Sequence, residues 1–337
     1  KLMLDVTYYN RLTTQQIAQR AVPTASGFSS VFSNFGAIRN QGWEIGVNAT
    51  PVELSGGFKW NVGVAFTRNR NVVEELADGV AELTLGGIGG GPGGPTPVAR
   101  PGYPFGVFRG TAAMRDSEGR FLIDPTTGLT IPNTEQQIIG DPNPDFVLGL
   151  TNTFSFKGFT LSALFDWRNG GQLYSQTTAF LLGRGTTKDT ENRDVPQIVP
   201  GVLGDPNTLK PLGDANGNPI VNNIQVMTND LYFQAQGTGS FAINGPLEFS
   251  IFDATTFRMR EITFGYEVPK GLIERTPFGA INLSVSGRNL WYKAPYFPKY
   301  TNFDPEVSSS GAGNAQGFDV QAAPTVKRIG VNLRLTF

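Results

Sequence analysis

The sequence predicts an all-β protein made of antiparallel strands. About eight segments of the chain alternate apolar and polar residues, which is the pattern of a strand with two different faces. The 42 glycines and 23 prolines gather between these segments, where turns and loops need them. No run of eighteen apolar residues occurs, so the sequence offers no transmembrane helix.

The composition excludes several kinds of chemistry. The 337 residues include no cysteine and no histidine, which removes disulfides, thiolate nucleophiles, imidazole metal ligands and Ser-His-Asp catalysis. A net charge of −1 provides no basic face for nucleic acid. Charged residues make up 16% of the chain, below the roughly 25% of an ordinary soluble domain. We therefore expect no enzyme activity, no metal, no cofactor and no nucleic-acid partner.

Seven strands follow directly from strict alternation along the chain. Their apolar residues, in order, are Leu2, Leu4, Val6 and Tyr8; Trp43, Ile45 and Val47; Phe58, Trp60, Val62, Val64 and Phe66; Phe146, Leu148 and Leu150; Phe159, Leu161, Ala163, Phe165 and Trp167; Ile281, Leu283 and Val285; and Ile329, Val331, Leu333, Leu335 and Phe337.

An eighth strand, at 255–268, changes its phase midway. Its apolar positions move from Phe257 and Met259 to Ile262 and Phe264. One extra residue in the strand produces such a shift, so we expect a β-bulge near Arg260 and Glu261.

The connections between these strands alternate strictly between short and long. The short ones are 55–57, 157–158 and 269–279, and the long ones are 13–38, 71–145, 169–254 and 293–324. If the eight strands all cross one layer, every short turn and both chain ends fall on one side, and every long loop falls on the other. Outer-membrane barrels have this arrangement, with tilted strands of about ten residues.

The same parity assigns two further apolar segments, 105–114 and 173–182, to structure within the extracellular loops. A large soluble antiparallel sheet remains the alternative, because alternation alone does not distinguish lipid from a protein core.

Short motifs occur in order along almost the whole chain. The most specific runs from Asn34 to Ile45, NFGAIRNQGWEI, with two Asn-x-Gly units, the second followed by an aromatic residue and Glu. The others are VTYYNR at 6–11, Trp60 with 69–73, GDPNPDF at 140–146, FRMREI at 257–262, SGRNL at 286–290, FDPE at 303–306 and the last strand. Together they resemble the C-terminal part of the SusC/RagA family of TonB-dependent outer-membrane transporters.

The resemblance implies that residues 1–337 are the C-terminal part of a TonB-dependent receptor β-barrel, with the plug domain and the N-terminal strands absent from this chain. Plugged barrels of this class have 22 strands, so about eight spanning strands form the closing third. An open sheet would leave unpaired backbone groups in lipid. A self-closed eight-stranded barrel is disfavoured, because side chains would fill so small a lumen.

The resemblance also implies a function and partners. We expect import of oligosaccharides or oligopeptides across the cell outer membrane of a Gram-negative-type bacterium, beneath a SusD-like lid lipoprotein and driven by the TonB complex. Outer-membrane lipid would surround the barrel. The final aromatic residue, Phe337, resembles the signal read by the barrel-assembly machinery, and it also suits a membrane girdle. A structural or adhesive surface protein without transport is the alternative.

Candidate binding residues come from the aromatic side chains of the outer loops. Trp291, Tyr292, Tyr296 and Tyr103 are candidates for substrate contact, since aromatic rings stack on sugars and hold peptide side chains. An interfacial aromatic belt explains Trp291 and Tyr292 equally well. We expect the strand arginines to line a wet lumen, namely Arg258, Arg260, Arg288, Arg328 and Arg334.

Two other loop features suggest a ligand, but we expect neither of them to bind one. The glycine-rich run 86–94 lacks the Lys-Ser/Thr of a phosphate-binding loop, so we expect a flexible loop. Several acidic and amide residues invite a calcium site, but no twelve-residue calcium loop is present and solvated side chains are favoured. These residues are Asp116, Glu118, Asp124, Asp141, Asp145, Asp205, Asp214, Asn216 and Asn218.

Overall fold

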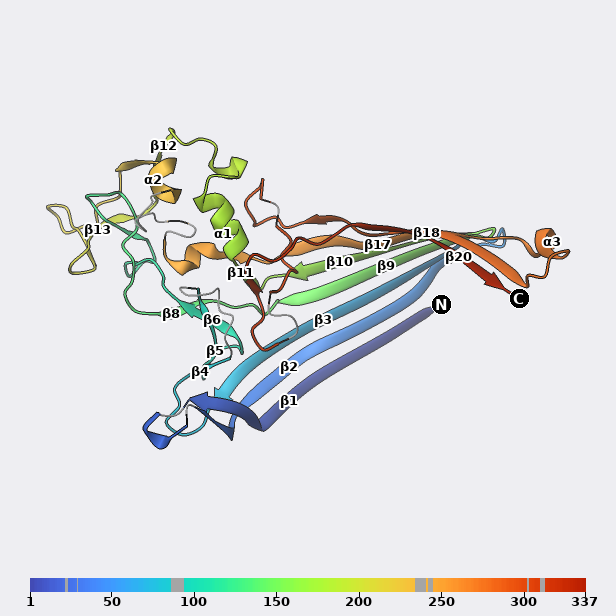
Figure 1. Ribbon diagram of the computed structural model, residues 1–337, viewed down its shortest axis with the longest axis horizontal. Coiled ribbons are helices and arrows are strands. Elements are labelled where there is room, and N and C mark those ends of the chain that lie inside the picture. Colours follow the sequence, from blue (N-terminus) through green and yellow to red (C-terminus); the bar gives the residue numbers. More distant parts are fainter. Residues whose placement is uncertain are drawn as a thin grey trace.

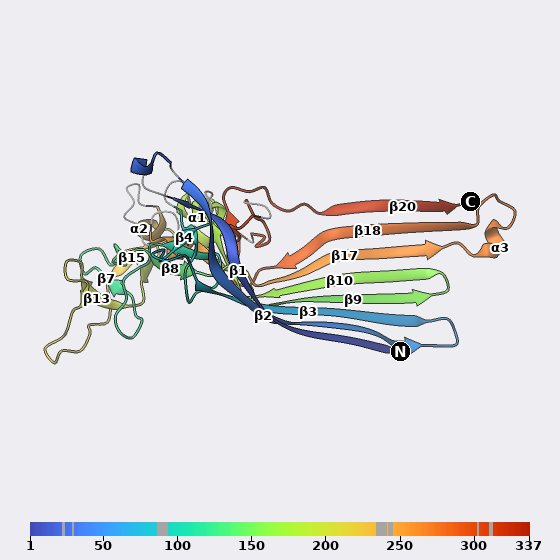
Figure 2. The same ribbon diagram turned by 90° about the horizontal axis from the view of Figure 1, so that it is seen from below.

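The computed structural model describes residues 1–21, 24–28, 30–85, 94–233, 241, 245–301, 303–309 and 313–337. Its main element is an antiparallel sheet of eight strands, in the order β1-β2-β3-β9-β10-β17-β18-β20 (Figure 2). The strands are β1 (Leu2–Ala21), β2 (Ser30–Glu53), β3 (Lys59–Glu75), β9 (Phe146–Phe156), β10 (Phe159–Asn169), β17 (Thr256–Glu267), β18 (Ala280–Lys293) and β20 (Arg328–Thr336). All eight predicted strands are confirmed.

The turns and the loops separate to opposite ends of the sheet (Figure 1). Both chain termini lie at the end that carries the short turns and the helix α3 (Lys270–Ile273). The loops after β3, β10 and β18 gather at the other end. The predicted parity of the connections is therefore confirmed for these loops.

The predicted long connection at 13–38 is wrong in most of its length. β1 and β2 pair continuously from Leu2 with Ala49 up to Ala21 with Ser30, interrupted only at Gln15, whose φ is 53°. Many described side chains in this upper hairpin are exposed, as Leu12 and Ile17 are at 43% and 75%, although Ala37 at its base is buried. The apolar alternation that marks a strand arises from one buried face, so a hairpin without a continuous buried face lacks that signal.

The loops build small sheets and helices of their own. The strands are β4 (Leu83–Thr84), β5 (Thr96–Ala99), β6 (Val107–Gly110), β7 (Leu122–Ile123), β8 (Gln137–Gly140), β11 (Gln172–Ser175), β12 (Pro196–Ile198), β13 (Val202–Asp205), β14 (Lys210–Pro211), β15 (Gln225–Met227), β16 (Ile251–Asp253) and β19 (Phe318–Asp319). The helices are α1 (Gln176–Gly183) and α2 (Thr228–Tyr232), and short 3-10 turns span Thr24–Ser26, Lys188–Thr190 and Leu247–Ser250.

The segments 105–114 and 173–182 lie within these loops, as parity predicts. The second segment is strand only as far as Ser175, and the helix α1 follows. The Ser175 hydroxyl accepts a hydrogen bond from the Thr178 N–H at 3.1 Å, which is the usual cap of a helix start.

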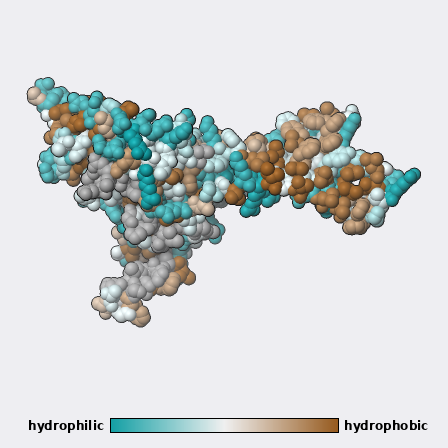
Figure 3. Space-filling view, turned by 45° about the horizontal axis from the view of Figure 1, so that its top comes forward, coloured by the Kyte–Doolittle hydropathy of each residue, from teal (hydrophilic) through white to brown (hydrophobic). Residues whose placement is uncertain are grey.

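The hydrophobic cores lie in the loop region. One contains Ile123, Leu129, Val199, Val226 and Leu231, and another surrounds Phe108 and Phe318. The apolar side chains of the eight-stranded sheet remain exposed instead, as Phe264, Val285 and Ile329 do at 50%, 46% and 78%. Figure 3 shows them as a hydrophobic surface over the sheet. Such a surface requires an apolar environment outside the chain. Among the described residues, no helix has the length and apolarity to cross a membrane.

Candidate functional site

Aromatic side chains form two rows on the apolar face of the eight-stranded sheet. The row nearer the loops contains Tyr8, Trp43, Phe66, Phe146, Trp167, Phe257 and Trp291, one from each strand between β1 and β18. Neighbouring rings touch: centroids are 4.9 Å apart for Tyr8 and Trp43, 4.8 Å for Phe146 and Trp167, and 5.2 Å for Trp167 and Phe257. The row nearer the turns contains Trp60, Phe154, Phe156, Phe159, Tyr266, Phe278 and Phe337.

The separation of the two rows matches the height of a membrane band. Phe146 and Phe156 stand at the two ends of β9, about 33 Å apart at roughly 3.3 Å per residue. In a strand tilted by about 40°, this length becomes a height of about 25 Å, which is that of the apolar band of outer-membrane barrels. The rows therefore have the spacing of two interfacial girdles.

The opposite face of the sheet is polar, and β17 contains a bulge beside its two arginines. Met259 pairs with Phe165 and Glu261 with Leu164, so Arg260 has no partner on β10. Arg258 and Arg260 are two residues apart, so both point to the polar face. The extra residue places Glu261 on this face as well, and the apolar positions resume at Ile262. The predicted bulge at Arg260 is confirmed.

These two arginines hold a loop against the wall of the sheet. Arg258 is buried and pairs with the buried Asp304, and it lies 3.3 Å from a carboxylate oxygen of Glu306. Arg260 donates to Asp166 of β10 at 2.6 Å and also pairs with Glu306. Because three charged partners share the cluster, the segment 303–306 is fixed on the sheet at the level where the strands reach the loops.

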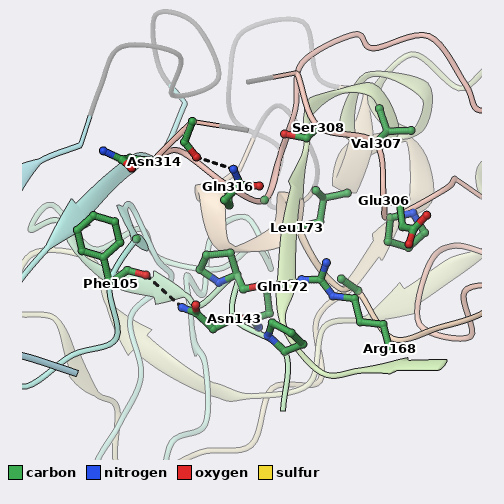
Figure 4. Close-up of a pocket in the computed structure, with 17 residues that line it drawn as sticks. Phe105, Asn143, Arg168, Gln172, Leu173, Glu306, Val307, Ser308, Asn314 and Gln316 are labelled. Carbon is green, nitrogen blue, oxygen red and sulfur yellow. Dashed lines mark hydrogen bonds between the residues drawn. The ribbon is translucent and has the colours of Figure 1, made fainter. Parts of the chain in front are cut away.

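A cavity of about 380 Å³ opens beside this cluster (Figure 4). Arg168, at the loop end of β10, and Gln172, at the start of β11, lie in its wall, and Glu306 lines it from the loop after β18. Arg168 Nη2 donates to the Pro142 carbonyl at 2.8 Å. The cavity therefore lies where the wall of the sheet meets three loops.

Two glycines allow the chain to turn between Arg168 and Gln172. Gly170 and Gly171 have φ of 69° and 73°, a conformation that costs other residues energy. A Cβ on Gly171 would lie 2.8 Å from the Pro142 carbonyl oxygen and 3.0 Å from Arg168 Nη2. Hence any larger residue at position 171 would displace the guanidinium that faces the cavity.

Amide side chains make the other side of the cavity rigid. Asn143 Nδ2 donates to the Phe105 carbonyl at 3.1 Å, and Asn143 Oδ1 accepts from Asn71 Nδ2 at 3.0 Å. Gln172 Oε1 accepts the Asp141 N–H at 2.9 Å. Asn143 uses both the oxygen and the nitrogen of its amide, whereas Gln172, which also lines the cavity, uses its oxygen in these contacts.

The structure separates the four predicted binding aromatics. Trp291 pairs with Met259 on the apolar face, whereas the ring of Tyr292 lies on the polar face, 5.3 Å from the Arg258 guanidinium. Tyr296 is 62% exposed in the loop after β18, and Tyr103 stacks with Arg100 at 5.4 Å. Trp291 and Tyr292 therefore do not share one ligand surface.

The pattern of the sequence did not predict that Arg168 and Gln172 line a cavity. Arg168 follows Trp167 as one more polar residue of a strand, and Gln172 gives no pattern at all. The available signal was the pair Gly170 and Gly171 directly after a strand, because adjacent glycines at a strand end indicate a tight backbone turn.

The acidic residues of the loops act within turns. Asp214 accepts the backbone N–H groups of Asn218 and Asn216 at 2.9 and 2.8 Å, and these hydrogen bonds hold its pKa below the ordinary value. Asp116 and Asp205 accept backbone N–H groups in the same way. Within the described residues, no group of three acidic side chains has an arrangement that could hold a metal ion. The glycine-rich run lies outside the described residues, apart from Gly94.

The fold and these surfaces define a class: a wall section of an antiparallel outer-membrane β-barrel, apolar on one face and polar on the other. The comparisons agree. Over all of its length the chain is 26% identical to TonB-dependent receptor P3 of Formosa agariphila and 23% identical to TonB-dependent receptor P26 of the same organism. It covers 32% and 33% of these proteins, so it spans about a third of the length of the curated relatives it matches. No protein-family model matches the chain.

Solved structures show the same fold. A chain of the RagAB peptide importer in its closed-closed state matches all of this chain with a TM-score of 0.64 at 20% identity, and 33% of that chain is covered. Another structure of the RagAB peptide transporter matches with a TM-score of 0.63 at 19% identity. The chain is thus a homologue of TonB-dependent receptors with the fold of a SusC/RagA-like transporter, which confirms the resemblance.

Proposed function

We propose that this chain forms part of the wall and the outer loops of a TonB-dependent importer of nutrients in the cell outer membrane. The observation that supports it best is the pair of aromatic rows about 25 Å apart in height, on the apolar face of a sheet whose loops all lie beyond one row. The homology to TonB-dependent receptors supplies the class of transport.

The proposal also covers the other domains and partners of the transporter. We place this chain at the C-terminal end of a larger barrel, with a plug domain and further strands supplied by the rest of the protein. A SusD-like lid lipoprotein would cover the loops, TonB would act through the plug, and the barrel-assembly machinery would read Phe337. The carried nutrient is an oligopeptide or an oligosaccharide.

The test is energised uptake by cells. Deletion of the gene for the full-length protein should abolish accumulation of a fluorescent oligopeptide or oligosaccharide, and inactivation of TonB should do the same. Complementation with the full-length gene restores it. Uptake that survives deletion, or that proceeds without TonB, contradicts the proposal. A loss of surface attachment without any change in uptake would favour the adhesive alternative.

A further inference from the structure

We propose that the cavity beside β10 is a subsite for a carboxylate, and that Arg168 is the residue that recognises it. The nearest described groups suit an anionic end of a longer ligand. The inference rests on the proposed import function, because it names the chemical class of the imported molecule.

Arg168 leaves part of its guanidinium without a hydrogen-bond partner in the described chain. Its Nη2 donates to the Pro142 carbonyl, but its buried Nε has no hydrogen-bond partner among the described residues. It also forms no ion pair with any carboxylate in the described part of the chain, although Glu306 lines the same cavity. The guanidinium is half-buried, and the charge of Glu306 attracts it without forming an ion pair. A direct carboxylate partner is therefore left for a ligand to supply.

Other arginines in similar surroundings differ in this respect. Arg109 and Arg258 each have a buried Nε without a partner in the described residues, but Arg109 pairs with Glu82 and Arg258 with Asp304. Arg168 alone among these three lacks a paired carboxylate and faces a cavity. The positive charge is therefore available to a ligand at this one position.

Glu306 attracts Arg168 but does not pair with it. Both of its oxygens are engaged by Arg260, and Arg258 lies 3.3 Å away, so these oxygens already have their hydrogen-bond donors. A carboxylate that enters the cavity thus meets Arg168 and Gln172, whose side chains both carry hydrogen-bond donors. Beside them, Phe105, Leu173 and Val307 provide an apolar surface for the adjoining part of the ligand.

The size of the cavity fits one end of an oligomer. At about 380 Å³ it is at the lower limit of ligand pockets, which hold roughly 300 to 1,000 Å³. Two sources of carboxylate have this form: the C-terminus of a peptide and the uronate group of an acidic oligosaccharide. They share the chemistry that Arg168 recognises.

The experiment measures equilibrium binding by the full-length protein purified in detergent. One pair of probes is a hexapeptide with a free C-terminus and the same peptide with a C-terminal amide. The other pair is tri-galacturonate and its neutral counterpart, galactotriose. We expect the wild-type protein to bind the acid of one pair at least tenfold more tightly than its neutral partner, as the loss of charge-assisted hydrogen bonds implies. The pair that shows this difference identifies the source.

Two variants test the residues. Arg168→Gln should lower affinity for the acid at least tenfold, to the level of the neutral probe, and should leave the neutral probe unchanged. Gln172→Glu retains the acceptor for the Asp141 N–H but places a negative charge beside Arg168, and it should also weaken only the acid. Arg334→Gln, on β20 far from the cavity, serves as the matched control that removes one positive charge and keeps both affinities.

Several outcomes overturn the proposal. One is equal affinity of the wild-type protein for acid and neutral probes in both pairs, including no binding of either. Another is an equal loss of affinity for the acid and the neutral probe in Gln172→Glu, which would assign the cavity a structural role. If Arg168→Gln fails to fold, the wild-type comparison and Gln172→Glu still decide. A protein that imports nutrients with TonB yet shows no preference for acids refutes this inference and leaves the proposed function intact.

Discussion

Asp189 joins two loops whose sequences are more than a hundred residues apart. Its carboxylate accepts the backbone N–H groups of Tyr300 and Thr301 at 3.1 and 3.0 Å, and the hydroxyls of Thr187 and Thr301 at 2.7 and 3.0 Å. Burial alone would raise the pKa of Asp189, but these hydrogen bonds together outweigh it and lower the pKa below 3.8. The charged form therefore ties the loop after β10 to the loop after β18.

This tie predicts a dependence on pH with a defined sign. The folded-state pKa is depressed, so the stabilisation is complete above about pH 4 and disappears as the pH falls through the folded value. In hydrogen exchange corrected for intrinsic rates, protection of the Tyr300 and Thr301 amides should remain constant from pH 7 to about 4 and then decline. Asp189→Asn should lower that protection throughout, by about 1 to 3 kcal/mol of opening free energy, and remove the decline.

Asp214→Asn is the matched control, because Asp214 accepts hydrogen bonds only from its own turn. It should leave the two amides at 300 and 301 unchanged. Constant protection down to pH 2, or full protection in Asp189→Asn, would contradict the role given to Asp189.

The contacts of single residues were harder to predict from the sequence than the strands were. Alternation assigned Arg258 to the polar face, because the period of a strand fixes the face of every residue. The expectation that it lines a wet lumen is wrong, because the segment 303–306 covers it and leaves it buried against Asp304. Alternation did not assign Arg168 to a cavity, since the cavity depends on loops that meet only in space. The proposed contacts of Trp291, Tyr292, Tyr296 and Tyr103 with a substrate remain predictions.

At the scale of elements, two arginines of β17 fix one loop to the wall. Arg258 pairs with Asp304 and Arg260 with Glu306, and both acids belong to the segment 303–306. Because residues two apart share one face of a strand, these two side chains together couple a strand of the sheet to a distant loop.

The buried pair of Arg258 and Asp304 predicts a non-additive pair of substitutions. Asp304→Ala leaves a buried guanidinium with less compensation and should destabilise the protein by about 3 to 5 kcal/mol. Arg258→Met combined with Asp304→Leu should cost clearly less, because an apolar pair replaces both charges. The free energy of unfolding in detergent, taken through a double-mutant cycle, measures the difference. If the double variant is as unstable as the sum of the single ones, the two side chains do not act as a pair.

The strands were predictable for a physical reason. A strand with one apolar and one polar face repeats every two residues. β20 keeps that repeat along its length, and β9 and β10 keep it over most of theirs, with exceptions at Asn152 and Leu164. In the upper half of the hairpin from β1 to β2, apolar side chains such as Leu12, Ile17 and Phe32 are exposed, so its sequence shows no regular apolar face. The helix α1 was missed because its apolar residues also fit a short strand, and Ser175 alone indicates its start.

At the scale of the whole molecule, the orientation in the membrane can be tested with single cysteines. The chain has no cysteine of its own, so Ser117→Cys marks a loop and Ser55→Cys marks a short turn, both at exposed positions. In the full-length protein on intact cells, a membrane-impermeant maleimide should label position 117 and should label position 55 only after the outer membrane is permeabilised. Equal labelling of both on intact cells would contradict the proposed crossing.

The placement of the cores has a consequence for the order of events during biogenesis. The cores around Phe108, Phe318 and Ile123 lie wholly among the loops, while the chain ends and short turns lie at the far end of the sheet. In the proposed orientation the polypeptide arrives from the side of the turns. These loops must then travel across the bilayer before their apolar side chains meet, so maturation of the outer surface trails insertion of the strands and is the last step to finish.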